Sequence, residues 1–252
     1  MPEKSSLSTN SKFRIQYEAQ LNASQLEAVM TTEGSLLVIA GAGSGKTRTL
    51  TYRVARLVED GVAPSSILLL TFTRKAAQQM TQRATRLLDR RCENVAGGTF
   101  HSFGNLTLRK YASALGMPSN FAIFDRVDAE ALISMLRKEI STATKHRSFP
   151  RKHTLANIFS RAVNKMIPID DVVYDDYPHL TGELEAINSI FHSYKRYKSE
   201  NNFFDFDDLL VYLLQLLKNH PDIRNRISSS YRYVMVDEYQ DTNKIQAEIL
   251  YL

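Results

Sequence analysis

The chain has 252 residues, of which 43% are hydrophobic, so it can bury a substantial core and is long enough for two domains. Its 32 basic and 27 acidic residues give a net charge of +5, which permits nucleic acid as a partner without requiring it. No apolar run approaches the length of a membrane span, the N-terminus lacks a signal-peptide core, and the single cysteine, Cys92, excludes an internal disulfide and a CxxC pair. We therefore expect a cytoplasmic protein without a membrane partner.

The N-terminal region divides into a polar part and a helix. Residues 1–19 are serine-rich and have no hydrophobic period, which predicts a flexible leader. A short helix follows, which Ser24 could cap and which would turn Leu26 and Val29 toward a core. Gln25 then lies near the nucleotide motif that comes next. Its amide matches the N6/N7 edge of adenine, although residue type alone favours a surface glutamine.

The next stretch is a candidate phosphate-binding loop. The apolar residues 36–39 predict a strand, the glycine-rich residues 40–47 a loop, and the following residues a helix. In such a loop the backbone N–H groups and the helix N-terminus face phosphate oxygens, Lys46 reaches the β- and γ-phosphates, and the Thr47 hydroxyl ligates Mg²⁺. A plain glycine-rich turn is the alternative, and Ala40 replaces the usual first glycine. The loop comprises Ala40, Gly41, Ala42, Gly43, Ser44, Gly45, Lys46 and Thr47.

Strands and helices then alternate. A helix is predicted to about Asp60, a continuously apolar strand over 66–73, a helix over 74–89, a short strand and loop over 95–103, and a helix through Tyr111. This order predicts an α/β fold with a doubly wound parallel sheet, in which ligands bind at the carboxyl ends of the strands.

Far downstream, residues 231–236 predict a strand that ends in two acids. Asp237 would hold Mg²⁺, and Glu238 would orient and deprotonate the water that attacks the γ-phosphate. A simple turn is the alternative interpretation. About 190 residues separate Lys46 from Asp237, many more than a few βα units of ~30 residues need, so we expect an insertion.

The insertion is predicted to be helical and partly basic. From about 106 to 202 the buried-strand pattern disappears, and residues 128–137 repeat apolar side chains at helical spacing. The acid pairs 170–171 and 175–176 are predicted to be solvated loops. A basic run is either a surface for a phosphate backbone or a solvated face. It has one acid, Glu139, and consists of Arg137, Lys138, Lys145, His146, Arg147, Arg151, Lys152, His153, Arg161 and Lys165.

Six segments, in this order, resemble the motifs of UvrD/Rep/PcrA-type superfamily 1A DNA helicases. They are residues 21–25, 40–48, 70–77, 98–103, 205–210 and 236–243. The resemblance implies a RecA-like P-loop NTPase motor domain with a parallel sheet, formed by residues 20–106 and 206–252. An inserted, mainly helical DNA-binding subdomain would occupy residues 107–205.

The resemblance also implies roles for single residues. It places Gln25 on adenine and Arg48 against the adenine ring, gives Lys46, Thr47, Asp237 and Glu238 the roles described above, and makes Gln240 a coupler of the γ-phosphate to movement. It places Phe72, Thr99 and His101 on single-stranded DNA. An aromatic ring such as Phe72 stacks on any base. Without the family, Phe72 and Phe100 would be interpreted as core residues and His101 as a loop histidine with its hydrogen bonds satisfied.

The implied function is that of an ATP-dependent DNA helicase, a hydrolase using ATP and Mg²⁺ on single-stranded DNA and single-strand/duplex junctions in repair or replication. The family's second motor domain, with arginines of the kind worth ~10³–10⁵ in rate in related systems, is expected beyond Leu252. We therefore expect an N-terminal portion with little activity alone. The alternatives are a nucleotide- and DNA-binding module without motor activity, or the motor part of a helicase–nuclease.

Overall fold

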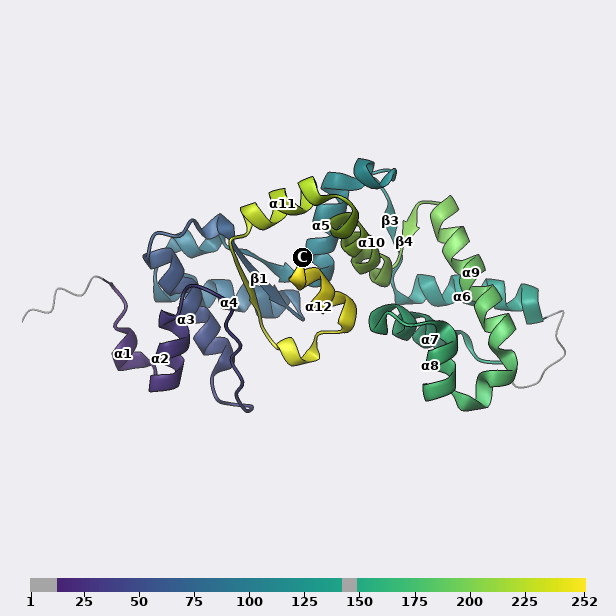
Figure 1. Cartoon of the computed structure of the whole chain (residues 1–252), viewed down its shortest axis with the longest axis horizontal. Helices are drawn as coiled ribbons and strands as arrows, with labels where there is room; N and C mark the ends of the chain where they lie inside the picture. The colour runs from purple at the N-terminus through teal and green to yellow at the C-terminus, as the bar shows by residue number, and fades with distance from the viewer. Residues whose placement is uncertain (1–12, 142–148) are drawn as a thin grey trace, which may run out of the picture. The chain divides into compact units, whose positions relative to one another are not determined.

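The computed structural model describes residues 13–141 and 149–252 (Figure 1). They form two compact units: the described residues up to Thr99 together with Ser228–Tyr239, and Phe100–Ile227 together with Gln240–Leu252. Within the described ranges, none of the helices combines the length and the apolar character that crossing a membrane requires.

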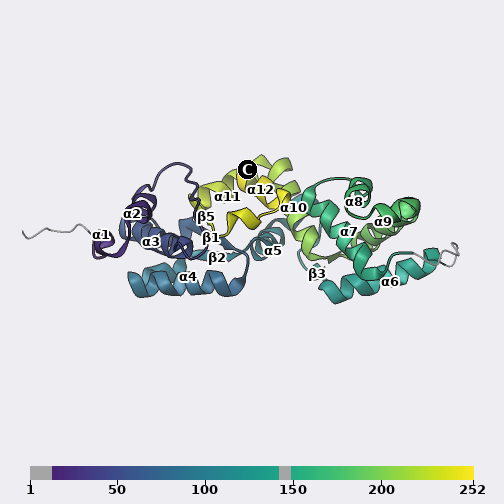
Figure 2. The ribbon, with the colours of Figure 1, turned by 90° about the horizontal axis from the view of Figure 1, so that it is seen from below.

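The first unit is built on a parallel three-stranded sheet. Its strands are β1 (Ile67–Thr71), β2 (Ala96–Thr99) and β5 (Tyr233–Val236), in the order β2-β1-β5, which Figure 2 shows side by side. Every residue of β1 is buried, as the continuous apolar run predicts for a strand covered on both faces. The register pairs Thr71 with Thr99 and Leu70 with Val236, so the carboxyl ends of all three strands lie at one edge of the sheet.

The helices that lie wholly within the described part of this unit are α1 (Tyr17–Gln20), α2 (Ala23–Met30), α3 (Lys46–Glu59) and α4 (Arg74–Leu87), with 3₁₀ turns at Pro64–Ser66 and Arg90–Asn94. The α/β class and the alternation of strand and helix are therefore confirmed. Thr73 caps α4, because its hydroxyl accepts a hydrogen bond from the Ala76 N–H at 3.1 Å. Gly61, with a φ of 93°, follows the end of α3 in the left-handed conformation that glycine adopts most easily.

The predicted strand over residues 36–39 is wrong. No strand is formed there, the sheet in the described part of the chain pairs nothing with it, and its four side chains are 43–88% exposed. Figure 1 accordingly draws the connection between α2 and α3 as coil. A strand exists only where a neighbour accepts its backbone hydrogen bonds, and a short apolar run carries no information about that neighbour.

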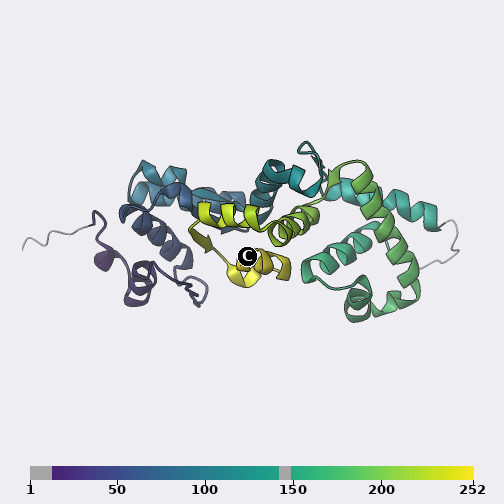
Figure 3. The ribbon, with the colours of Figure 1, turned by 45° about the horizontal axis from the view of Figure 1, so that its top comes forward.

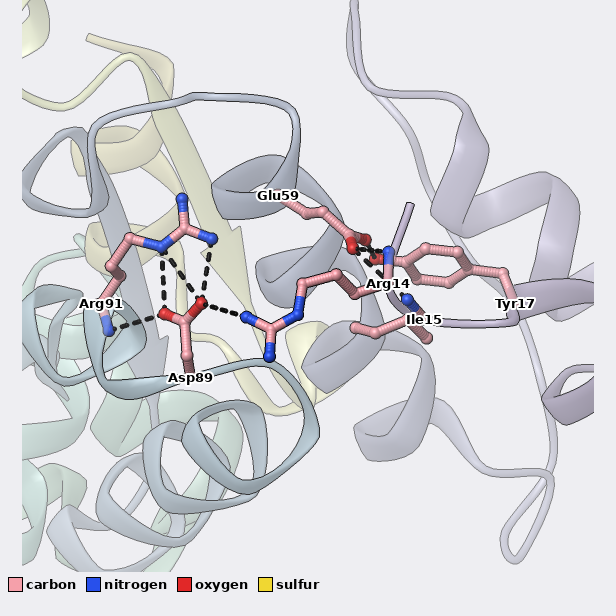
Figure 4. A network of polar contacts seen from close by, with 6 residues as sticks. All are labelled: Arg14, Ile15, Tyr17, Glu59, Asp89 and Arg91. Carbon is pink, nitrogen blue, oxygen red and sulfur yellow. Dashed lines mark hydrogen bonds and ion pairs between the residues drawn. The ribbon is translucent and has the colours of Figure 1, made fainter. Parts of the chain in front are cut away.

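Residues 13–19 also differ from the predicted leader, because they pack on the core. Ile15 and Tyr17 are 6% and 3% exposed. The Tyr17 hydroxyl donates to Glu59 Oε2 at 2.7 Å, and Arg14 forms an ion pair with Asp89 at 3.3 Å (Figure 4). Burial, with the Glu59 carboxylate beside it, raises the pKa of Tyr17. This part of the leader is therefore ordered by its partners, and residues 1–12 lie outside the described residues.

The second unit is mainly helical. Its helices are α5 (Phe100–Tyr111), α6 (Arg126–Ser141), α7 (Lys152–Lys165), α8 (Ile169–Asp176), α9 (Leu184–Glu200), α10 (Phe206–Asn219), most of α11 (Pro221–Ser230) and α12 (Lys244–Tyr251), and β3 (Ala122–Ile123) pairs with β4 (Phe203–Phe204). In Figure 3 the teal and green helices α6 to α9 lie together, and they share one apolar core. A second core joins α5 to α10, where a Cβ on Gly104 would meet the Leu209 carbonyl oxygen at 3.1 Å.

Two local predictions for this unit are corrected. Residues 100–103, expected in a strand and loop, begin α5. Both acid pairs, expected in loops, lie in helix α8, where Asp170 accepts a hydrogen bond from Asn188 at 2.6 Å and Asp176 pairs with two basic residues. Acids are favoured in the first turn of a helix, which accounts for Asp170 and Asp171 there.

A polar cluster fixes the start of α10. The Lys198 ammonium lies 2.5 Å from both Asp205 Oδ2 and Asp208 Oδ2, and the Tyr194 hydroxyl donates to Asp205 at 2.8 Å. Asp205 and Asp208 also form a capping box, each accepting the other's backbone N–H. Burial and the neighbouring Asp205 raise the pKa of Asp208 to about 6. We call these four residues the Lys198 cluster.

Candidate nucleotide site and DNA-contact residues

The glycine-rich loop has the backbone that its composition predicts. Gly43 and Gly45 have φ angles of 76° and 89°, in the left-handed region that other residues adopt at a cost. The loop is tightened by the Ser44 hydroxyl, which donates to the Gly41 carbonyl at 2.7 Å. Residues 40–44 are exposed, and α3 begins directly afterwards at Lys46. An anion can therefore approach the loop backbone and the N-terminus of α3.

Gln25 braces this loop. Its Nε2 donates to the Ser44 carbonyl at 3.0 Å, and its Oε1 accepts the Asn22 N–H at 3.2 Å. Asn22, rather than Ser24, is the N-cap of α2 and completes a capping box with Gln25. A Cβ on Gly45 would lie 2.7 Å from Gln25 Nε2 and would displace that amide, and the φ angle of 89° itself favours glycine. Gln25 is thus brought to the loop, as the sequence predicts, and its adenine contact stays a prediction.

Lys46 and Thr47 start helix α3 and face different groups. The Lys46 ammonium donates to the carbonyl oxygens of Ala40 and Gly41 at 3.0 and 3.2 Å, so the side chain lies back over the loop. The Thr47 hydroxyl lies 3.5 Å from Asp237 Oδ2, at the end of β5. The fold therefore brings together the two residues that the sequence assigned to Mg²⁺ from opposite ends of the chain.

The acids after β5 occupy a strained turn. The Asp237 N–H donates to the Leu70 carbonyl at 3.0 Å, which extends the pairing of β5 with β1 and leaves Asp237 7% exposed. Burial, and then the charge of Glu238, raises the pKa of Asp237, while Thr47 and Lys46 lower it. Glu238 has a φ of 53°, a conformation that costs a residue with a Cβ on the order of 1 kcal/mol or more. Such strain concentrates at functional turns.

These residues fit a magnesium ion. Mg²⁺ takes oxygen ligands, keeps several waters and needs only one or two protein carboxylates beside substrate phosphates. The Thr47 hydroxyl and the Asp237 carboxylate supply oxygens 3.5 Å apart, and burial disfavours the Asp237 charge in a way that a cation would reverse.

Arg48 and Gln240 complete the predicted nucleotide residues. Arg48 donates to the Gln20 carbonyl at 2.9 Å, and its guanidinium lies 5.3 Å from the centre of the Tyr52 ring. Tyr52 is hydrogen-bonded to the Gln20 side chain, so both orient Arg48, a role the sequence analysis missed. Gln240 lies in a 3₁₀ turn, Tyr239–Asp241, of which the second unit contains the part from Gln240 onward.

Two predicted DNA-contact residues lie at the same sheet edge as Asp237. Phe72 directly follows β1 and is 47% exposed, and Thr99 ends β2 beside Thr71. Thr71 is buried and donates to the Thr73 carbonyl at 2.7 Å, which turns the chain after β1. An apolar ring exposed to this extent is available to stack, so Phe72 is not the core residue that the alternative proposed.

The third predicted residue, His101, lies in α5 of the second unit. Its ring meets that of Phe206 edge to face, at 5.7 Å between centres and 89° between planes. Burial lowers the pKa of His101, so the imidazole is neutral at pH 7. Phe206, the first residue of α10, is 49% exposed and was missed by the sequence analysis. The local pattern points the other way, because Phe206 lies three, four and seven residues before the buried Leu209, Leu210 and Leu213, which is the spacing of a core residue.

The basic run is partly neutralised by its own unit. Lys152 lies 3.7 Å from Glu130, and Arg161 and Lys165 both pair with Asp176. Arg137 donates to the Pro150 carbonyl at 2.8 Å. The predicted members Lys145, His146 and Arg147 lie outside the described residues. Exposed ion pairs are weak, so the pairing leaves these side chains able to exchange a carboxylate for a phosphate, and the DNA surface stays a prediction.

A parallel sheet, a glycine-rich loop opening a helix and acids at the end of a neighbouring strand define an α/β domain of the P-loop nucleotide-binding class. The model of the UvrD/REP helicase N-terminal domain family matches residues 21–252, and the chain belongs to this family. It is 36% identical over 234 residues to the ATP-dependent DNA helicase PcrA of Staphylococcus aureus strain Mu50, and 36% identical over 233 residues to that of Staphylococcus epidermidis strain ATCC 35984. Each match covers 92% of this chain and 31% of the relative's length.

Proposed function

We propose that this chain is the first motor domain of an ATP-dependent DNA helicase, which couples hydrolysis of Mg–ATP to movement along single-stranded DNA and to duplex unwinding. One observation carries the proposal: the hydroxyl of Thr47, in the phosphate loop, lies 3.5 Å from the Asp237 carboxylate at the end of β5. A merely structural glycine turn has no need of a buried acid from a strand so distant in sequence. The family membership and the relatives' name, ATP-dependent DNA helicase, support it.

In this proposal each nucleotide residue has a role. The loop N–H groups bind phosphate oxygens, and Lys46 exchanges the carbonyls of Ala40 and Gly41 for the β- and γ-phosphates. Mg²⁺, held by Thr47 and Asp237, would neutralise the phosphate charge when bound. Glu238 orients the attacking water and accepts its proton.

Three further residues complete the nucleotide site. Gln25 and Arg48 bind the adenine base, by hydrogen bonding and by stacking respectively. Gln240 senses the γ-phosphate and passes its presence to the rest of the chain.

Each unit offers an exposed ring for single-stranded DNA, Phe72 after strand β1 in the first unit and Phe206 at the start of α10 in the second. Phe72 and Phe206 offer π faces on which bases of any sequence stack, at ~1–3 kcal/mol per base. Thr99 in the first unit and the neutral His101 in the second add hydrogen-bonding groups for DNA. A path read by stacking is tolerant of sequence, which a translocating enzyme requires.

The wider context is also proposed. We predict that the substrates are single-strand/duplex junctions in repair or replication and that the location is cytoplasmic. We also predict a second motor domain, and a division of this chain into a motor domain at residues 20–106 and 206–252 and an inserted subdomain at residues 107–205. A nucleotide- and DNA-binding module without motor activity is the principal alternative. A helicase–nuclease would be distinguished by nuclease carboxylates elsewhere in the full-length protein.

The test is ATP hydrolysis by the full-length protein and by this chain, each with and without single-stranded DNA. We expect DNA-stimulated turnover by the full-length protein and its loss in Lys46→Ala and Glu238→Gln, because these remove the phosphate ligand and the general base. Lys195→Ala, at an exposed position of α9 outside the motif segments, is the matched control. Retained unwinding by either site variant would contradict the proposal, and a full-length protein that binds both ligands without turnover would establish the binding module.

A further inference from the structure

Asn243 lies five residues after Glu238 and uses both ends of its side-chain amide. It is the N-cap of α12, where its Oδ1 accepts the Gln246 N–H at 2.9 Å. Its Nδ2 donates to Asn164 Oδ1 at 2.5 Å, and Asn164 belongs to α7. The segment that follows the catalytic acids is therefore fastened to a helix of the basic run.

Asn164 also forms hydrogen bonds with residues other than Asn243. Its Nδ2 donates to Asp207 Oδ1 at 2.9 Å and to Ser160, whose carbonyl and hydroxyl oxygens lie at 2.8 and 3.1 Å. An amide has two N–H donors and one carbonyl oxygen. Asn164 thus uses both donors and its acceptor to join three helices, α7, α10 and α12, within one unit.

Asp207 needs the Asn164 donor. Burial, and then the charge of Asp205, raises the pKa of Asp207, and the hydrogen bonds from Ser160 and Asn164 oppose this rise. A buried carboxylate that loses a donor becomes costly, so movement of Asn164 disturbs Asp207. Asp207 directly follows Phe206, whose ring contacts His101.

We propose that Asn164 is a positioning residue that couples the nucleotide-sensing turn at Glu238–Gln240 to the DNA-contact pair His101–Phe206, through hydrogen bonds to Asn243 on one side and Asp207 on the other. This inference rests on the proposed function and assigns the coupling to one side chain. Its physical basis is directional: an N–H···O bond stretched to about 3.5 Å is lost, so a small shift of the α12 N-terminus forces the Asn164 amide to turn.

The test uses the full-length protein and the variant Asn164→Asp, which replaces both donors by an acceptor facing Asp207. We expect hydrolysis without DNA to stay within about twofold of wild type. DNA stimulation of kcat, and the change in single-stranded DNA Kd between an ATP analogue and ADP, should each fall about tenfold, within the range of allosteric couplings. The double variant N164D/D207N exchanges the two groups, so that an amide at position 207 donates to the carboxylate at position 164, and should recover both.

Two further variants separate coupling from folding. Asn243→Ser keeps an N-cap oxygen but removes the donor to Asn164, so it should reproduce the loss without uncapping α12. Asn188→Asp creates a similar acid pair with Asp170 in the same unit and should have no effect on coupling. Unchanged DNA stimulation in Asn164→Asp or Asn243→Ser would overturn the inference. Wild-type protein without DNA-stimulated turnover would instead overturn the proposed function.

Discussion

Two buried acids, Asp237 in the first unit and Asp208 in the second, both have a raised pKa but differ in whether a lysine pairs with them. Burial raises the pKa of both, and a second acid raises it further. Asp208 forms an ion pair with the Lys198 ammonium at 2.5 Å. Lys46, the first residue of helix α3 and the neighbour of Thr47, instead donates to loop carbonyls. A cluster that contains its own cation is complete and structural. A buried acid whose neighbouring lysine donates to other groups is what the proposed magnesium site requires.

The largest expected effect is on the free energy of unfolding, which should fall much further when Lys198 is replaced than when Lys46 is. Lys198→Met leaves Asp205 and Asp208 buried without their cation, and breaking a buried pair costs about 3–5 kcal/mol. Lys46→Met removes only hydrogen bonds to exposed loop carbonyls, so its free energy of unfolding should change by less than about 1 kcal/mol while nucleotide binding is lost. Urea denaturation followed by circular dichroism measures both. Equal destabilisation by the two variants would break the comparison.

A smaller effect is expected at the open sheet edge beside Asp237. Phe72→Leu keeps an apolar side chain but removes the π face, so affinity for single-stranded DNA should fall by ~1–3 kcal/mol. Phe72→Tyr keeps the ring and should bind normally. Fluorescence anisotropy with a labelled oligonucleotide measures both variants. Unchanged binding by Phe72→Leu would remove this residue from the DNA path.

The smallest expected effect is a pH dependence of the free energy of unfolding that arises in the Lys198 cluster. Because the folded pKa of Asp208, about 6, exceeds its unfolded value, the folded state binds an extra proton between about pH 4 and 6. The contribution of Asp208 to the free energy of unfolding should therefore increase as the pH falls through that window, by about 1 kcal/mol or more. Asp208→Asn should lack this slope when unfolding is followed at pH 4.5 and 6.5. A variant with the wild-type slope would contradict the assignment to Asp208.

The sequence predicted what local chemistry determines. Strand β1 follows from an uninterrupted apolar run, and the left-handed turns of the glycine-rich loop follow from Gly43 and Gly45, which adopt such φ angles easily. The acids after β5 follow from their place at a strand end. These features depend on short stretches of chain, so composition and spacing were sufficient.

What the sequence missed depends on distant partners. Residues 36–39 look buried in sequence but have no strand beside them in the part of the chain that the structure describes. Tyr17 looks like part of a leader but is held by Glu59. Asn164 carries no motif at all, and its bonds to Asn243 and Asp207 span 79 and 43 residues. Pairings of this kind are set by the fold and leave no periodic signal.

The most direct test of the proposed magnesium site at Thr47 and Asp237 is the magnesium dependence of nucleotide binding. Calorimetry with a non-hydrolysable ATP analogue, with and without Mg²⁺, should give wild-type protein a Kd at least about tenfold lower with the metal, a difference of about 1.4 kcal/mol. Asp237→Asn should lose this dependence, and Asp208→Asn should keep it. Asp237→Asn with undiminished magnesium dependence would contradict the account, because the buried acid beside Thr47 would then have no part in holding the nucleotide's metal.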